Sequence, residues 1–165
     1  MQNHYNYSFD ALTNTYNFIT KNGILYRVAF IIDETFSTIS GKAISNVYQI
    51  VIDKATDETE PFDKNVSKTV ENIIECFFMK VENALIYVCS DDDEKATLRY
   101  KVFDRWYQNS KHKENIVKID NVLNIKIDDS ETQLLYTSFM FHKNNEHFET
   151  LMSIYLTMES TLNNK

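Results

Sequence analysis

The chain has 165 residues, 43% of them hydrophobic, which is enough material for one domain with a substantial core. Its only glycines, Gly23 and Gly41, exclude the glycine-rich loops of P-loop and dinucleotide-binding proteins. A formal net charge of -7 repels the phosphate backbone of nucleic acids, so the composition disfavours nucleic-acid binding and favours a basic protein partner.

The first third of the chain predicts strands, because aromatic and apolar residues alternate there with polar ones. This alternation covers residues 5–9, 16–18 and 26–32, and the first of these strands is short. A polar connection rich in Ser and Thr follows over residues 34–46, and alternation then resumes over residues 47–53. The pattern therefore predicts four strands before the first helix.

The loop between the second and third strands decides their register. A two-residue Asn-Gly turn would pair Phe18 with Arg27, which mixes apolar and charged side chains on one face. A three-residue loop at 21–23 instead pairs Phe18 with Tyr26, so that the apolar faces agree. We therefore predict the three-residue loop, with Gly23 in the left-handed conformation of a bulged hairpin.

The clearest helix follows a charged loop that contains the only proline. Six apolar residues recur there at the three- and four-residue spacing of one helical stripe. Asp63 or Asn65 can cap the helix start. The stripe consists of Val66, Val70, Ile73, Ile74, Phe77 and Phe78.

The remaining elements alternate between strands and helices. Residues 84–89 are continuously apolar, as expected of a strand that is covered on both faces. Residues 116–127 and 134–142 predict an antiparallel pair around a polar turn at 128–130. The helix after residues 84–89 is expected to bury Leu98, Val102, Phe103 and Trp106. The last helix of the chain is expected to bury Phe148, Leu151, Met152, Tyr155 and Met158.

The predicted order is thus β-β-β-β-α-β-α-β-β-α, in a single α+β domain that spans residues 1–165. We expect one layered domain with a mixed, mostly antiparallel sheet and about three helices. Strand order stays open, because a hydrophobic pattern determines faces but not neighbours.

Cysteine usage and hydropathy favour a cytoplasmic protein. Cys76 and Cys89 lie in apolar runs, which predicts reduced, structural thiols. The first ten residues have neither the basic nor the apolar region of a secretory signal, and no apolar run reaches the length of a membrane span.

Several short motifs carry a resemblance to a family of uncharacterised bacterial proteins, known only as a domain of unknown function. The motifs are Phe77-Phe78, a Cys-x-Asp turn at 89–91, and Arg99, Phe103 and Trp106 in an Arg-x-x-x-Phe-x-x-Trp helix. The chain departs from the family at Asn144-Asn145, where the family has Asn-Pro. The resemblance implies the fold and no activity.

Charge concentrates where the strand at 84–89 meets the next helix. Asp91 and Asp93 belong to a run of acids that could bind a divalent cation through carboxylate oxygens. The alternative is helix capping, with Glu94 three residues after Asp91 as in a capping box. We favour capping, because acids at a helix start also complement the helix dipole.

The helix that follows carries two of the chain's three arginines. Arg99 and Arg105, together with Trp106, could hold a phosphate or a carboxylate while the aromatic ring stacks on a ligand. The structural alternative pairs Arg99 with nearby acids and places Trp106 in the core. We retain Asp91, Asp93, Arg99, Arg105 and Trp106 as candidate binding residues.

A second hypothesis is a divalent-metal nuclease or hydrolase with a ribonuclease H-like arrangement. In that arrangement Glu71 or Glu75 would supply a helix acid, Asp91 a central acid, and Glu146 or Glu149 a fourth. The strand at 14–20 has no carboxylate to complete the set.

We therefore expect a binding protein rather than an enzyme, with no cofactor, no catalytic residue and no bound metal. The expected function is a macromolecular-interaction module in an accessory, antitoxin-like or immunity-like role, with a protein partner. Its oligomeric state stays open.

Overall fold

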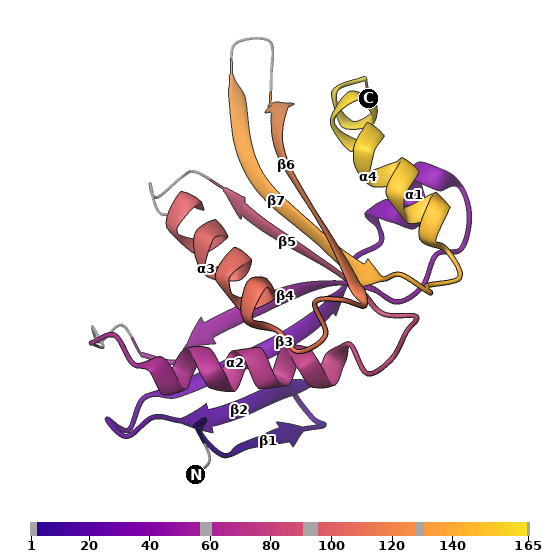
Figure 1. Cartoon of the computed structure of the whole chain (residues 1–165). Coiled ribbons are helices and arrows are strands. Elements are labelled where there is room, and N and C mark those ends of the chain that lie inside the picture. The colour runs from indigo at the N-terminus through magenta and orange to yellow at the C-terminus, as the bar shows by residue number, and fades with distance from the viewer. Residues whose placement is uncertain (1–2, 57–60, 91–95, 128–130, 165) are drawn as a thin grey trace.

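A computed structural model of the chain describes residues 3–56, 61–90, 96–127 and 131–164. These residues form seven strands and four helices, which confirms the α+β class (Figure 1). In chain order the elements are β1 (Tyr7–Asp10), β2 (Thr15–Ile19), β3 (Leu25–Ile32), α1 (Thr35–Ser40), β4 (Val47–Lys54), α2 (Lys64–Phe77), β5 (Ala84–Ser90), α3 (Ala96–Asn109), β6 (Ile116–Lys126), β7 (Thr132–His142) and α4 (Phe148–Asn163).

All seven strands belong to one mixed sheet, in the order β1-β2-β3-β4-β5-β7-β6. The pair β4–β5 is parallel and the other neighbouring pairs are antiparallel. The predicted mixed, mostly antiparallel sheet is therefore correct. The predicted turn at 128–130 lies outside the described residues.

The predicted element order is wrong at one place, because α1 interrupts the polar connection expected at 34–46. Helix α1 has only six residues and one buried side chain, Phe36, so it creates no hydrophobic periodicity in the sequence. The Phe36 ring stacks on Phe139 with centroids 4.8 Å apart, which holds α1 against the sheet. Gly41 ends the helix with a left-handed φ of 65°.

The β2–β3 register is the predicted one. Phe18 pairs with Tyr26, and their rings stack with centroids 5.2 Å apart. Gly23 has a φ of 78°, the left-handed conformation that the three-residue loop requires. Apolar patterning was therefore sufficient to choose between the two loops.

Of the two proposed caps for α2, the structure uses Asp63. Its carboxylate accepts a hydrogen bond from the backbone N–H of Asn65 at 2.9 Å. The Tyr5 hydroxyl donates to the other oxygen at 2.6 Å, and this bond holds the pKa of Asp63 below its usual value. The cap thereby links the start of α2 to the chain just before β1.

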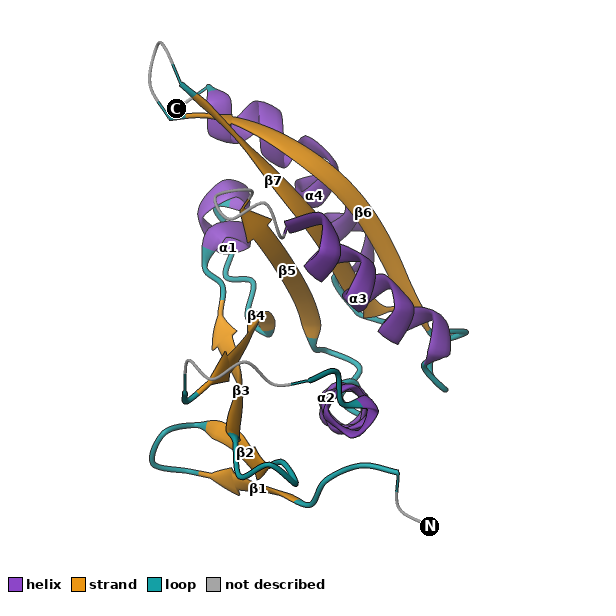
Figure 2. Ribbon diagram, turned by 90° about the vertical axis from the view of Figure 1, so that its left-hand side faces the viewer, coloured by secondary structure: helices purple, strands orange, loops and turns teal. Residues whose placement is uncertain are grey.

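Helices cover the sheet on both faces, around two hydrophobic cores. Helices α2 and α3 lie on one face of the sheet (Figure 2). Their side chains share a hydrophobic core with β2–β5 and β7. On the opposite face α1 and α4 cover β5, β6 and β7 together with the start of β4. Within the described residues, no helix combines the length and the apolar character needed to cross a membrane.

Leu98 and Cys76 were predicted to be buried and are exposed. Leu98 is 62% exposed, because it lies two residues from the buried Ala96 and hence about 200° around α3. Cys76 is also exposed, whereas Cys89 is buried as predicted, and both are free thiols. Cys76 lies beside the Tyr7 hydroxyl at 3.6 Å, away from the core-facing line of α2.

Candidate binding cleft

The sheet separates between β4 and β5. The two strands pair over three residues only, and the last pair is Gln49 with Ile86. Beyond it β4 stays paired with β3 as far as Lys54, and β5 stays paired with β7 as far as Ser90. Figure 1 shows the two strands diverging, with α3 lying over the space between them.

The separation exposes backbone groups on two facing strand edges. The Val47 carbonyl accepts a hydrogen bond from the Asp33 N–H, so the backbone N–H and C=O groups of Val47 and of every second residue after it point towards β3. The backbone groups of the residues between them, including Ile52, point towards β5. The Ala84 N–H donates a hydrogen bond to the carbonyl of Asn46, the residue before β4. The backbone groups of every second residue of β5 from Ala84, including Val88, therefore point towards β4. Among the described residues, neither Ile52 nor Val88 has a partner across this gap in the β4–β5 pairing.

A cleft of about 470 Å³ occupies this position. Its walls are residues 49–52 of β4 and 87–89 of β5, and we call it the β4–β5 cleft. Val51 of β4 is 42% exposed and Val88 of β5 is 37% exposed. The exposure of Val88 differs from the prediction that both faces of β5 are covered. Helix α3 forms the floor through Arg99, Val102, Phe103 and Trp106.

Stacked aromatic rings make the floor rigid and apolar. The rings of Tyr87 and Phe103 lie with centroids 3.4 Å apart, and Trp106 meets Phe103 edge-on at 4.7 Å. The Cys89 thiol donates to the Tyr87 hydroxyl at 2.7 Å. Burial, reinforced by this bond, raises the pKa of Tyr87, so its hydroxyl is neutral at physiological pH.

Trp106 brings an unsatisfied donor to this region. Its side chain is 9% exposed, and its indole N–H is buried without a hydrogen-bond partner among the described residues. The same ring also borders a cavity of about 30 Å³ between α2 and α3. Buried donors in folded proteins are nearly always paired, so this N–H is an exception among the described residues.

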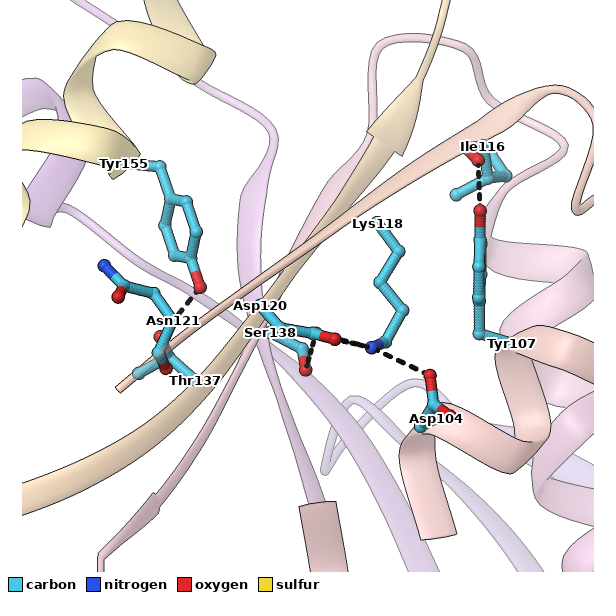
Figure 3. Close-up of polar contacts among 9 residues, drawn as sticks. All are labelled: Asp104, Tyr107, Ile116, Lys118, Asp120, Asn121, Thr137, Ser138 and Tyr155. Atoms are coloured by element: carbon cyan, nitrogen blue, oxygen red, sulfur yellow. Dashed lines mark hydrogen bonds and ion pairs between the residues drawn. The ribbon is translucent and has the colours of Figure 1, made fainter. Parts of the chain in front are cut away.

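A buried lysine fixes α3, and with it the cleft floor, to the sheet. Figure 3 shows Lys118 of β6 between two carboxylates, Asp104 of α3 and Asp120 of β6. The Lys118 side chain is 3% exposed, and its Nζ lies 3.1 Å from Asp104 and 2.6 Å from Asp120 Oδ2. The same ammonium lies over the rings of Tyr100 and Tyr107, at 5.4 and 5.8 Å from their centroids.

Asp120 is the most heavily bonded acid of this cluster. Burial opposes its ionisation, but hydrogen bonds from Lys118, Ser138 and Tyr100 together hold its pKa below the usual value. Ser138 of β7 donates to it at 2.7 Å, so the cluster joins β6, β7 and α3. This arrangement anchors secondary structure, and none of the candidate residues predicted from the sequence belongs to it.

A second polar contact fixes α4 to the sheet. The Tyr155 hydroxyl lies 2.7 Å from Thr137 Oγ1, and Thr137 also donates to the Asn121 carbonyl at 2.9 Å (Figure 3). Burial raises the pKa of Tyr155 to about 12, so the group is neutral at physiological pH. Strands β6 and β7 are thus held by polar contacts to a helix on each face.

The structure describes three of the five predicted binding residues, Arg99, Arg105 and Trp106. Arg99 and Trp106 both line the β4–β5 cleft, seven residues apart on one face of α3. Arg105 does not join them, because it lines a different hollow between α2 and α3. Asp91 and Asp93 lie outside the described residues, so capping and cation binding both stay predictions there.

The acids proposed for a metal-dependent enzyme are not brought together where the structure describes them. Glu71 pairs with Lys68, and Glu146 lies 3.7 Å from His147. Glu75 belongs to α2 and Glu149 to α4, which pack on opposite faces of the sheet. In the described ranges no three His, Cys, Asp or Glu side chains form a group that could hold a metal ion.

Comparison with known families adds to this geometry. The model of a family of unknown function, DUF6169, matches residues 62–156. The chain belongs to the DUF6169 family. The DUF6169 match includes α2, β5, α3, β6, β7 and most of α4, so Arg99 and Trp106 lie within it, while β4 lies before it. No curated protein and no solved structure matches the chain.

Proposed function

We propose that the protein is an interaction module that takes an extended segment of a partner protein into the β4–β5 cleft as an added strand. The observation that carries this proposal is the early end of the β4–β5 pairing, which leaves backbone donors and acceptors on two facing edges. Strand addition uses such groups for affinity and uses pockets under alternate side chains for specificity.

The cleft floor supports the same proposal. A strand between β4 and β5 would direct every second side chain towards α3, where Val102, Phe103 and Trp106 offer apolar contact. Burial of Val51 and Val88 would add hydrophobic stabilisation, because both are partly exposed.

The partner class follows from charge. The chain as a whole carries a net charge of -7, which attracts a basic protein at long range and repels nucleic acid, although Arg99, the charged residue among those that line the cleft, is cationic. We propose an accessory, antitoxin-like or immunity-like role in the cytoplasm, in which the module holds a partner protein. The metal-dependent nuclease or hydrolase is the weaker proposal, since no observation on the described acids favours it.

Site-specific photo-crosslinking in the source cells tests the proposal. A benzophenone amino acid at Val88 reports on the cleft, and the same group at Ile19, 60% exposed on β2, is the control. We expect a discrete cross-linked polypeptide from position 88 and none from position 19. Equal adducts at the two positions, or no adduct at position 88, would refute the proposal.

A backbone substitution sharpens this test. Ile52→Pro removes an N–H that faces the cleft and leaves the β3 ladder intact, because the backbone groups of Ile52 point away from β3. Ile52→Val keeps the N–H and serves as the matched control. We expect the adduct at position 88 to disappear with proline and to persist with valine, in variants whose circular dichroism matches the wild type.

A further inference from the structure

A second free strand edge lies on β3, on the side of that strand that faces away from β4 and the β4–β5 cleft. Pairing of β2 with β3 ends at Thr15 and Ala29, whereas pairing of β3 with β4 continues to Ile32. The last three residues of β3, 30–32, therefore have a neighbouring strand on one side only. This edge stands independently of the proposed function, because no residue that lines the cleft lines it.

The direction of the backbone groups on this edge follows from two backbone hydrogen bonds. The Leu25 carbonyl accepts from Ala55, and the Asp33 N–H donates to Val47, and both partners lie on the β4 side. Odd-numbered residues of β3 therefore face β4, and even-numbered residues face the β2 side. The N–H and C=O groups of Phe30 and Ile32 point to the side where β2 has ended.

A groove of about 670 Å³ lies along this edge, and we call it the β3-edge groove. Five aromatic residues line it, and four of their rings form two contacting pairs: Phe9 with Tyr16 at 5.0 Å, and Phe30 with Phe77 at 4.2 Å between centroids. Phe9 and Ile32 are 52% and 63% exposed. Large exposed apolar side chains gathered in one groove indicate a binding surface.

Lys80 gives the groove its charge preference. It is the only charged residue among the described residues that line the groove, and no described side chain forms an ion pair or hydrogen bond with its ammonium. The chain as a whole has a net charge of -7, so this groove is locally cationic on an acidic protein. A carboxylate on the ligand would complement Lys80 and raise the association rate.

We infer that the β3-edge groove binds an extended peptide segment in which a bulky apolar residue neighbours an aspartate or glutamate. The peptide backbone pairs with Phe30 and Ile32, as in strand addition. Its apolar side chain packs on the Phe9 and Tyr16 rings, and its acid pairs with Lys80. Recognition therefore combines a strand edge, an aromatic wall and one cation.

Selection from a random octapeptide library displayed on phage, against the immobilised full chain, tests this inference. Enriched sequences are expected to share an apolar residue next to an acid, and the best of them is synthesised with amidated and free carboxyl termini. The two forms are expected to bind equally. Tighter binding of the free acid alone would overturn the assignment to an acidic side chain in favour of a chain terminus.

Matched variants locate the binding. We expect about tenfold weaker peptide binding for Lys80→Gln and for Ile32→Pro, which removes the free N–H, a loss equivalent to about 1.4 kcal/mol. Lys42→Gln, at another exposed lysine, and Ile32→Val are expected to bind as the wild type does. Unchanged affinity in both test variants, or no enrichment above background, overturns the inference.

The free thiols give an independent readout. Cys76 lines the groove and is exposed, whereas Cys89 is buried, so iodoacetamide reacts selectively with Cys76 in the folded chain. The bound peptide is expected to slow alkylation of Cys76 several-fold. An unchanged alkylation rate at saturating peptide places the peptide elsewhere and also overturns the inference. Self-association that blocks Cys76 without peptide would assign the groove to a second copy of the chain.

Discussion

Replacing Lys118 by methionine tests whether the buried charge cluster holds α3 against the sheet. Methionine keeps an unbranched apolar stem of similar length, so the substitution removes charge and hydrogen bonds without opening a large cavity. The Lys118 side chain is 3% exposed, whereas those of Asp104 and Asp120 are 44% and 38% exposed. Water can therefore rehydrate both carboxylates after the substitution.

The expected loss follows from these exposures. Breaking a fully buried ion pair costs about 3–5 kcal/mol, and an exposed pair is worth about 0.2–1 kcal/mol. Lys118 serves two half-exposed acids, so we expect the free energy of unfolding to fall by about 2 kcal/mol. For a chain of 165 residues this corresponds to a melting temperature about 4–8 °C lower.

Urea unfolding at neutral pH measures this loss, and Lys101→Met, at an exposed lysine of α3, is the control. The control should change stability by less than about 0.5 kcal/mol. The pKa of Asp120 is lowered in the folded chain, so its ionised form stabilises the fold above about pH 4. The deficit of Lys118→Met should therefore shrink as the pH falls through the folded pKa of Asp120. A variant as stable as the wild type would refute the reasoning, because it would show that desolvation of the ammonium outweighs its contacts.

Three further outcomes are expected. Gly23→Ala forces an L-residue to a φ of 78° and should cost about 1–2 kcal/mol in urea unfolding; an unchanged midpoint would contradict the left-handed loop. Asp63→Ala removes the cap of α2 and the Tyr5 bond and should cost about 1–2 kcal/mol. Because the pKa of Asp63 is lowered, that cost should be present above about pH 4 and lost at lower pH; a cost independent of pH would count against the cap. Millimolar Mg²⁺ or Mn²⁺ should leave the melting temperature unchanged, whereas a rise abolished by Asp91→Asn would favour the metal-dependent enzyme.

Most of the fold could be predicted from the sequence, because each long element buries one periodic face. The β2–β3 register followed from matching Phe18 with Tyr26, and the helix start followed from a cap at Asp63 or Asn65, of which the structure uses Asp63. Helix α1 escaped prediction, because a single buried aromatic, Phe36, produces no period. Local patterns thus sufficed wherever several side chains share a face.

The cleft could not be predicted, because it depends on which strands are neighbours and on where their pairing ends. Periodicity assigns Val88 to a face of β5 but cannot show that β4 has diverged from it. Helical spacing could have separated the arginines, since Arg99 and Trp106 share a face and Arg105 lies about 100° from Trp106. Lys118-x-Asp120 also carried a signal, because strand residues two apart lie on one face.

The residue types on the two unpaired strand edges indicate that these edges bind another chain. Natural proteins protect exposed strand edges with prolines, lysines or bulges, since an unprotected edge pairs with other chains. The edge residues Ile52 and Val88 of the cleft, and Phe30 and Ile32 of the β3-edge groove, are neither charged nor proline. The chain's one proline, Pro61, lies between β4 and α2. Both edges open onto aromatic surfaces, with Arg99 beside one and Lys80 beside the other, and we infer that they are kept free to receive another chain.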